Sequence, residues 1–503
     1  MEEEWLYEAI TGTYLPLLQM FEGLLTDHVP YRCTVSLSAP LISMLNDDLL
    51  KQRYAEYLDD LIELASKEID RTKNEPQYQR LAQMYGDRFQ SLRHTWRSHD
   101  GNLLQAFRRL QEAGRLEVIT STATHAFFPL MDRNWAAIRA QVHTAADLYE
   151  KHFGRRSLGM WLGECGYVPG IDELLREAAV RYFMVDTHAI LYADRRPAYG
   201  VYAPLYCPTG VAAFGRDTES SEQVWSSKSG YPGDAHYRDF YRDIGFDLPM
   251  EYIGPHVHPE GHRMYTGFKY YSITHDKLHD KWVYDPDIAR GKAGMHASNF
   301  RGNMEKQAAR LAGHMDRPPI IVSPYDAELY GHWWYEGPLF LGDLFRQLHY
   351  DQNSIASVTP GDYLDLHPTN QVATPCASSW GLKGYNQQWL NETNAWTYRH
   401  VHSAGERMVE LARRYSAVSD GLTLRALNQA ARELMLAQSS DWTFIMSTGT
   451  TVPYATRRFN EHIIRFNRLY DGLKLGAVEE PFLAGLEAQD NIFPNVDYRI
   501  YAS

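Results

Sequence analysis

Short apolar runs alternate with longer amphipathic segments over much of the chain. The apolar runs have the length of buried strands, and one further segment alternates apolar and polar positions as a half-buried strand does. These predicted strands are residues 32–38, 116–120, 158–162, 182–185 and 320–322. Segments with the spacing of helices follow three of them, at residues 134–152, 171–179 and 338–349. Strands that alternate with helices predict a parallel sheet with crossover helices, so we expect an α/β fold.

The pattern differs near both ends of the chain. Residues 5–24 repeat apolar side chains at helical spacing, and a charged, helix-rich segment at about 47–114 is typical of a helical insertion or of a pair of barrel helices. A loop rich in Trp, Gly and Asn, at 378–396, precedes three amphipathic helices at 401–415, 423–438 and 456–473. We therefore expect residues 1–372 to form a (β/α) barrel domain that contains the insertion. Residues 373–503 are expected to form a helical C-terminal domain.

Composition and charge exclude several classes of protein. The chain has 503 residues, of which 44% are hydrophobic and 22% charged, an ordinary globular mixture. Its 50 Lys and Arg against 63 Asp and Glu give a net charge of −13, which offers no attraction to nucleic acid. No apolar run reaches the roughly 18 residues of a membrane helix and no signal peptide is evident, so we expect a cytoplasmic protein without a membrane partner. Four widely spaced cysteines fit a reduced compartment and no disulfide framework.

A carboxylate follows directly after one predicted strand, in the sequence Trp161-Leu-Gly-Glu164-Cys-Gly-Tyr167. A charge placed there costs free energy unless it is paired or solvated. Glycines on both sides let other groups approach the backbone closely. Glu164 is therefore a candidate catalytic residue. The alternative is a Glu that caps the next helix or pairs with an Arg.

A second dense pattern follows the strand predicted at 320–322. It runs from Ser323 to Gly337 and contains three carboxylates, a histidine and two adjacent tryptophans, Trp333 and Trp334. Aromatic faces stack on sugar rings, and carboxylates bind sugar hydroxyls. The alternative is that both tryptophans belong to the core and that Asp326 caps a helix.

Three polar residues each follow a predicted strand at the same end of the sheet. In barrels of parallel strands the chemistry lies on loops at the carboxyl ends of the strands, where His125, Glu164 and Asp326 all fall. Glycoside cleavage needs two carboxyl groups that flank the scissile bond. The retaining geometry, with carboxyl groups about 5–5.5 Å apart, is available to Glu164 and Asp326 because both follow strands at the same end of the sheet.

These residues resemble glycoside hydrolase family 57, and within it the 1,4-alpha-glucan branching enzymes. The resemblance covers nearly the whole chain. Its segments are Glu4–Ile10, Glu117–Thr120 with His125, Trp161–Tyr167, Tyr325–Gly337 and Ser440–Trp442. It implies a distorted (β/α)7 barrel with a C-terminal helical domain, and a retaining mechanism that uses no metal and no organic cofactor.

The resemblance also implies roles for single residues. Carried over by position, Glu164 is the nucleophile, Asp326 is the general acid/base and His125 lines the donor subsite. Tyr199 falls where the family has a mobile loop whose tip favours transfer over hydrolysis. Further substrate-binding positions are Trp380, Trp389 and Asp441, where the helical domain closes over the cleft, and Trp333 and Trp334, which would stack on the acceptor.

The chain departs from the family at its N-terminus. The family begins with a strand that ends in His-x-His-x-Pro, and no such motif occurs near Met1. Three explanations are open: a misassigned start, a truncated chain, or a barrel that lacks its first strand, which would leave one edge unpaired. A similar triplet of histidines at 256–262 lies in mid-chain, where we expect a solvated loop and, as the alternative, a metal site.

The predicted reaction is the transfer of a glucan segment. Glu164 attacks the anomeric carbon of an α-1,4 linkage while a protonated Asp326 protonates the leaving oxygen. The 6-hydroxyl of another glucan chain then forms an α-1,6 branch, as in glycogen biosynthesis. The α-1,4-glucan, of the amylose, glycogen or starch type, is thus both donor and acceptor. The alternatives are an α-glucan hydrolase, a 4-α-glucanotransferase, an inactive glucan-binding protein and a metal-dependent deacetylase-like barrel.

Overall fold

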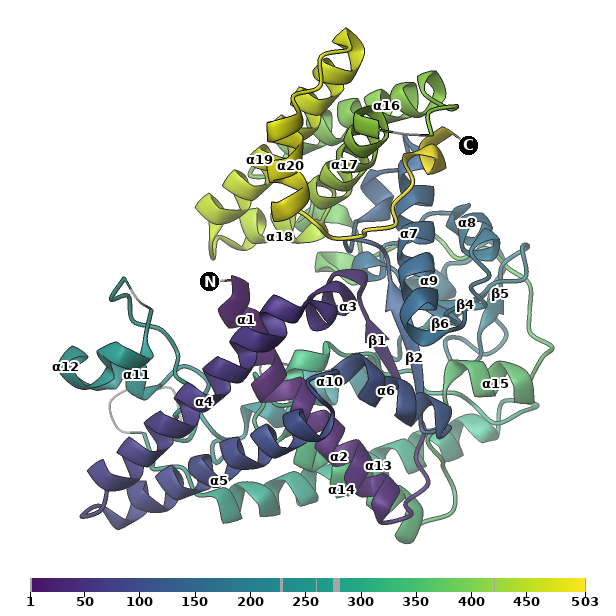
Figure 1. Cartoon of the computed structure of the whole chain (residues 1–503). Helices are drawn as coiled ribbons and strands as arrows, with labels where there is room; N and C mark the ends of the chain where they lie inside the picture. The colour runs from purple at the N-terminus through teal and green to yellow at the C-terminus, as the bar shows by residue number, and fades with distance from the viewer. Residues whose placement is uncertain (1, 227–228, 259, 275–280, 420, 503) are drawn as a thin grey trace. The chain divides into compact units, whose positions relative to one another are not determined.

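The computed structural model describes residues 2–226, 229–258, 260–274, 281–419 and 421–502 (Figure 1). The chain divides into two compact units, and each is built from segments that are far apart in the sequence. Unit 1 comprises Met1–Cys33, Leu45–Glu117 and Asp217–Thr359, and unit 2 comprises Thr34–Met44, Val118–Arg216 and Pro360–Ser503. The domain boundary after residue 372 that the sequence suggests stays a prediction.

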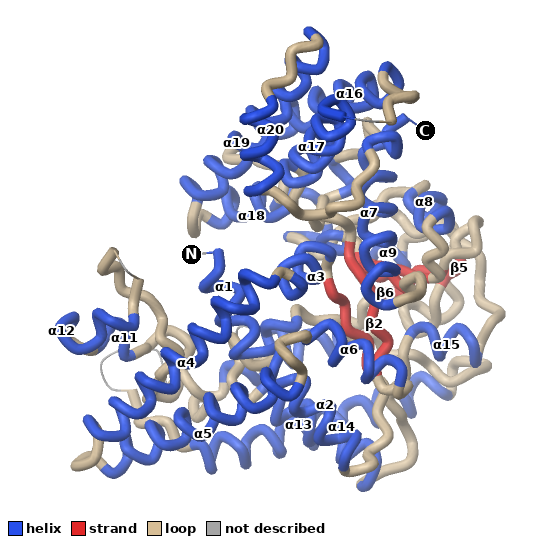
Figure 2. Tube along the Cα trace, viewed as in Figure 1, coloured by secondary structure: helices blue, strands red, loops and turns tan. Residues whose placement is uncertain are grey.

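Six described strands form one sheet in the order β1-β2-β3-β4-β6-β5, drawn in red in Figure 2. They are β1 (Cys33–Leu37), β2 (Leu116–Ser121), β3 (Gly159–Trp161), β4 (Tyr182–Val185), β5 (Leu205–Tyr206) and β6 (Ala212–Gly215). The neighbours β2, β3, β4 and β6 pair in parallel, with Thr120 opposite Met160 and Met160 opposite Phe183. β5 pairs antiparallel with β6. The α/β class is confirmed, while closure of the sheet into a barrel stays a prediction.

Helices follow the parallel strands of unit 2, and the first two of them confirm the helices predicted at 134–152 and 171–179. They are α7 (Trp135–Phe153) after β2, α8 (Ile171–Glu177) after β3 and α9 (Thr187–Leu191) after β4, and α15 (Pro360–Leu366) lies further along the chain. α7 packs against the sheet, where the Tyr149 hydroxyl donates to the Val118 carbonyl oxygen at 2.6 Å. α3 (Ala39–Asn46) includes residues of both units.

The C-terminal part of unit 2 is a helical bundle, as the three amphipathic segments predict. Its helices are α16 (Tyr398–Arg414), α17 (Gly421–Ala437), α18 (Ser440–Thr448), α19 (Val452–Leu475) and α20 (Glu480–Gln489). A buried polar network lies inside it, where His462 Nδ1 is 2.7 Å from Glu433 Oε2. No helix in the described ranges combines the length and the apolar character that crossing a membrane requires.

Unit 1 is mostly helical. Its helices are α1 (Glu2–Ala9), α2 (Leu15–Thr26), α4 (Asp48–Arg71), α5 (Pro76–Ser98), α6 (Leu103–Glu112), α10 (Thr218–Trp225), α11 (Ile244–Asp247), α12 (Met250–Ile253), α13 (Pro286–Ala312) and α14 (Gly337–Tyr350). α4, α5 and α6 confirm the helix-rich segment at 47–114. α4 and α5 run beside each other as a hairpin (Figure 1).

The first helix is interrupted, which its apolar spacing does not predict. A π-helical turn, Ile10–Tyr14, separates α1 from α2. Gly12 passes very close to the loop before α14, because a Cβ at Gly331 would lie 2.0 Å from the Gly12 carbonyl oxygen. The neighbouring Thr13 hydroxyl accepts a hydrogen bond from the His332 backbone N–H at 3.1 Å. The π-turn therefore fixes the loop that contains Trp333 and Trp334.

The strand predicted at residues 320–322 is wrong. This segment is outside every described strand, and the Val322 carbonyl oxygen accepts instead from the backbone N–H of Asp217 at 2.8 Å. Pro318, Pro319 and Pro324 flank the apolar run. Since proline has no N–H to donate, these flanks cannot support a strand ladder.

Candidate active site

Glu164 is buried at the end of β3, on a short 3-10 turn, Gly163–Cys165. Its side chain is held by two donors. The Trp380 indole Nε1–H donates to Glu164 Oε2 at 2.7 Å, and the Ser440 hydroxyl donates to Oε1 at 3.1 Å. Hydrogen bonds to an ionised carboxylate are among the strongest in proteins, so Glu164 has one defined orientation.

The glycines of this motif are needed for close approach. A Cβ at Gly163 would lie 2.6 Å from the Ala126 carbonyl oxygen and 2.8 Å from that of His125. Glu164 itself has a φ of 60° and Cys165 one of 53°, in the left-handed region that non-glycine residues rarely adopt. Backbone strain of this kind is found disproportionately at functional sites. The turn therefore presents Glu164 at the strand end at a cost in local stability.

His125 lies beside Glu164, as their matching positions after β2 and β3 predict. Its Nδ1 is 3.0 Å from the Ser440 hydroxyl and 3.9 Å from Glu164 Oε1. The loop also pairs with the start of α18, since Ala126 bridges to Ser439 and the Ser440 backbone N–H donates to the His125 carbonyl oxygen at 3.3 Å. The C-terminal bundle thus supplies part of the site inside unit 2.

Trp380 contacts Glu164 through both its side chain and its backbone. Besides its indole bond, its backbone N–H donates to the Glu164 carbonyl oxygen at 3.0 Å. The ring packs edge-on against Trp161 with centroids 5.0 Å apart, and the Arg216 guanidinium lies 5.9 Å from the Trp380 ring centre. Trp380 is therefore both a donor and part of an aromatic wall next to Glu164.

One group of potential metal ligands surrounds the same point. Ligand atoms of His125, Glu164 and Asp441 all lie within 4.8 Å of one another. Both oxygens of Glu164 already accept hydrogen bonds, from Trp380 and Ser440, which suits a carboxylate held for nucleophilic work better than one held for a cation. A second group among the described residues, Glu433, His462 and Asp490, is enclosed in the bundle core.

The other predicted side chains of unit 2 have different surroundings. Trp389 is buried and stacks on Phe127, with ring centroids 4.3 Å apart. Tyr199 lies half-buried in the loop after α9, which Gln371 holds by bonds to the Ala198 N–H and the Arg196 carbonyl oxygen at 2.8 and 2.9 Å. Their roles in substrate binding stay predictions.

Asp326, Trp333 and Trp334 belong to unit 1. Asp326 is half-buried and precedes a 3-10 turn, Ala327–Leu329. Glu328 on that turn accepts a hydrogen bond from the buried Tyr14 hydroxyl at 2.5 Å, so it has a structural partner. Trp334 is buried, while Trp333 is 45% exposed and remains available for a ligand.

Sequence reasoning missed Ser440. It bonds both Glu164 and His125, yet only its neighbour Asp441 was selected as a candidate. A serine has little chemical signature of its own. The signal that could have found it was its place in the Ser440-Asp441-Trp442 segment that carries the resemblance.

Two family models match the chain. The model for glycosyl hydrolase family 57 matches residues 1–376. The model for the C-terminal part of 1,4-alpha-glucan branching enzymes matches residues 400–501. The chain therefore belongs to glycosyl hydrolase family 57, which confirms the family that its motifs resemble.

Individual relatives are similar over the full length. The chain is 33% identical to the 1,4-alpha-glucan branching enzyme TK1436 of Thermococcus kodakarensis, over 100% of this chain and 75% of that protein. The crystal structure of a family 57 branching enzyme from Pyrococcus horikoshii matches with a TM-score of 0.89 and 32% identity, covering 100% of this chain and 92% of that one. The crystal structure of the alpha-amylase AmyC from Thermotoga maritima matches with a TM-score of 0.94 and 46% identity, covering 100% and 95%.

Proposed function

We propose that this protein is a 1,4-alpha-glucan branching enzyme that works by a retaining transglycosylation. The observation that carries the proposal is the buried Glu164 carboxylate, fixed by Trp380 and Ser440 beside His125. Two further findings support it: the branching-enzyme model that matches residues 400–501, and the full-length relatives named as branching enzymes. The proposed setting is cytoplasmic glycogen biosynthesis.

The proposed reaction has two steps. In the first, Glu164 attacks the anomeric carbon of an α-1,4 linkage, the bond to the leaving oxygen breaks, and Asp326 gives that oxygen its proton. In the second, the 6-hydroxyl of an acceptor chain attacks the glycosyl-enzyme and gives its proton to Asp326, which regenerates Glu164. Trp333 and Trp380, which are not buried as Trp334 and Trp389 are, would hold the acceptor in place of water.

A second candidate function is hydrolysis. It is favoured by the 46% identity to a protein described as an alpha-amylase. The same two carboxylates would serve, because water and a sugar hydroxyl attack the same glycosyl-enzyme. The two functions differ only in the acceptor of the second step.

Linkage analysis of amylose incubated with the protein distinguishes them. A branching enzyme increases α-1,6 linkages, measured by proton NMR, with a much smaller rise in reducing ends. A hydrolase raises reducing ends without new branches. A Glu164→Gln variant should lose both signals, while Glu173→Gln, an exposed glutamate on α8, should keep them. Full activity of Glu164→Gln would refute the role of Glu164.

Tyr199 provides a second discrimination. If its loop shields the glycosyl-enzyme from water, Tyr199→Ala raises the ratio of reducing ends to new α-1,6 linkages. Tyr192→Ala is the matched control, because this tyrosine is 71% exposed just after α9. An equal ratio of reducing ends to new linkages in both variants would refute the proposed role of Tyr199.

A further inference from the structure

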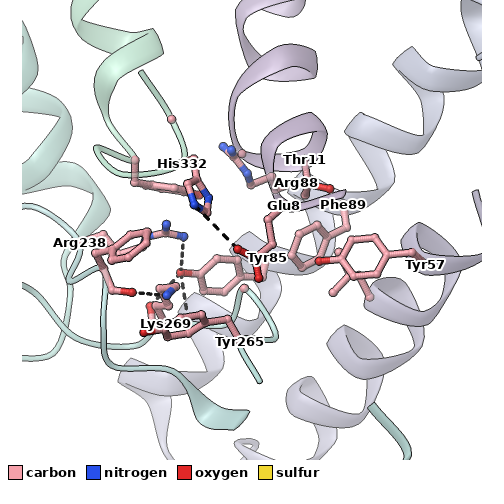
Figure 3. Close-up of a pocket in the computed structure, with 16 residues that line it drawn as sticks. Glu8, Thr11, Tyr57, Tyr85, Arg88, Phe89, Arg238, Tyr265, Lys269 and His332 are labelled. Carbon is pink, nitrogen blue, oxygen red and sulfur yellow. Dashed lines mark hydrogen bonds and ion pairs between the residues drawn. The ribbon is translucent and has the colours of Figure 1, made fainter. Parts of the chain in front are cut away.

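A cavity of about 60 Å³ lies inside unit 1 (Figure 3). Its walls come from α1 and the π-turn, from α4 and α5, from residues 238–269 and from the loop at 331–335. Tyrosine and phenylalanine rings form much of the lining. None of the charged residues in its walls takes part in the reaction proposed above.

Three cations converge on this cavity. The guanidinium carbons of Arg88 and Arg238 lie 4.5 and 4.0 Å from the centre of the same Tyr335 ring. The Lys269 ammonium lies 4.1 Å from the centre of the Tyr265 ring. Arg238 is 9% exposed and Lys269 is 4% exposed. Like charges held this close in the interior repel each other and require a counter-charge.

Glu8 is the one carboxylate in the walls, and it offsets this charge only in part. Burial raises the pKa of Glu8 to about 7, so much of it is a neutral acid at neutral pH. The His332 ring, whose Nε2 is 3.8 Å from Glu8 Oε2, adds no charge there, because burial and the nearby cations lower its pKa to about 4. A protonated Glu8 can donate a hydrogen bond into the cavity.

The carboxylates behind the walls are occupied by other donors. Asp243, with Oδ2 3.8 Å from Lys269 Nζ, accepts from the backbone N–H groups of Gly245, Thr266 and Gly267 at 2.8 to 3.0 Å. Glu336 accepts from the backbone N–H of Arg238 at 3.1 Å and from the Tyr284 hydroxyl at 2.8 Å. They help to keep the cations charged, and the Lys269 ammonium also donates to the Phe240 carbonyl oxygen.

The Arg238 guanidinium keeps open hydrogen-bonding capacity. Its Nε is buried and has no hydrogen-bond partner among the described residues, and its Nη1 reaches the Tyr85 hydroxyl only at 3.5 Å. Leaving a buried charged donor unsatisfied destabilises the folded state. Arginine is also the side chain best suited to bind oxyanions through two parallel hydrogen bonds.

We propose that this cavity binds one small oxyanion with the size and charge of inorganic phosphate. A volume of about 60 Å³ corresponds to roughly four or five water positions, which matches the four oxygens of such an ion. Arg88, Arg238 and Lys269 supply the positive charge, and Glu8 in its acid form donates to a protonatable oxygen. Because the ligands come from α1, from α5 and from residues 238–269, the bound ion stabilises the packing of these three segments against one another.

The test is a titration of the full-length protein with sodium phosphate, followed by thermal unfolding, with sodium chloride at matched ionic strength as reference. A ligand that binds only the folded state raises the midpoint, and above the dissociation constant the rise grows with the logarithm of the ligand concentration. The variant is Arg88→Gln, and the matched control is Arg93→Gln, an arginine on the same helix that pairs with Asp59 outside the cavity.

We expect the midpoint to rise with phosphate for the unmodified protein and for Arg93→Gln, and we expect Arg88→Gln to need about tenfold or more phosphate for the same rise. Calorimetric titration should report one phosphate per chain. Three outcomes overturn the proposal: a phosphate effect no larger than that of chloride, equal phosphate dependence in the two variants, or a rise that depends on Arg88 and is produced by glucose in place of phosphate.

Discussion

Glu164 owes its orientation to neighbours that lie far away in the sequence. Trp380 and Ser440 come more than 200 residues later and each donates to one carboxylate oxygen. The strained backbone at Glu164 and Cys165 persists because the surrounding contacts hold it there. We therefore expect these two hydrogen-bond donors to determine the reactivity of the Glu164 carboxylate more than the neighbouring aromatic rings do.

The indole N–H of Trp380 is the donor that can be tested most cleanly. Trp380→Phe keeps an aromatic ring and removes the hydrogen bond to Glu164. Since a hydrogen bond to a charged group contributes about 1.5–3 kcal/mol, we expect the transfer rate to fall roughly tenfold or more. Trp396→Phe is the control, because it also removes an indole hydrogen bond, the one from Trp396 Nε1–H to the Thr393 carbonyl oxygen at 3.1 Å, at a residue with no proposed role in the reaction. Equal rates for the two variants, measured per mole of folded protein, would contradict the role of Trp380.

Gly163 tests whether close backbone approach shapes the site. Gly163→Ala would place a methyl group 2.6 Å from the Ala126 carbonyl oxygen. We expect overpacking to lower the free energy of unfolding by about 1–3 kcal/mol and to lower activity. Gly485→Ala on α20 has open space and should leave stability equal or slightly higher. Equal thermal midpoints for both variants would show that the turn relaxes around the added methyl group.

At the scale of elements, two sets of polar contacts join segments that are far apart in the sequence. The π-turn between α1 and α2 brings Thr13 to His332 and Tyr14 to Glu328, so it fixes the loop that follows Asp326. In the C-terminal bundle, His462 joins α19 to Glu433 on α17. Both junctions place polar groups in the interior, where they give specificity to the packing of helices.

The bundle junction predicts a dependence of stability on pH. Burial lowers the pKa of His462 to about 4 from its ordinary value of 6.5. Between pH 6.5 and pH 4 the unfolded chain binds a proton on this histidine that the native ring does not bind. The free energy of unfolding therefore falls as the pH falls from 6.5 toward 4. Burial raises the pKa of Glu433 and of Asp490. These two carboxyls act in the opposite direction, because as the pH falls they take up protons in the native state before they do in the unfolded chain, which raises the free energy of unfolding.

A comparison with His462→Gln isolates the contribution of this histidine to the pH dependence of stability. Between pH 7 and pH 5 the unmodified protein should lose about 2 kcal/mol more unfolding free energy than the variant, since only its unfolded state gains the histidine proton. Urea unfolding at the two pH values measures the difference. A loss of the same size in both proteins would show that His462 is not the group that responds.

For the whole molecule, the sequence predicted local features better than long-range assembly. Apolar period and motif position located most strands and helices, and also the neighbours His125 and Glu164, because those signals are local. The missing strand at 320–322, the π-turn and the contribution of Ser440 depend on proline flanks or on contacts between distant segments. The interleaving of segments into two units has no local signature at all.

In the first step of the proposed reaction, Glu164 becomes covalently bonded to the sugar. Mass spectrometry of peptides from the protein after reaction with an activated fluoroglucosyl donor, which forms the glycosyl-enzyme quickly and releases it slowly, tests this directly. The account predicts one added glycosyl group on the peptide that contains Glu164, and none in Glu164→Gln. A label on another carboxylate, or complete turnover of the donor by Glu164→Gln, would contradict it.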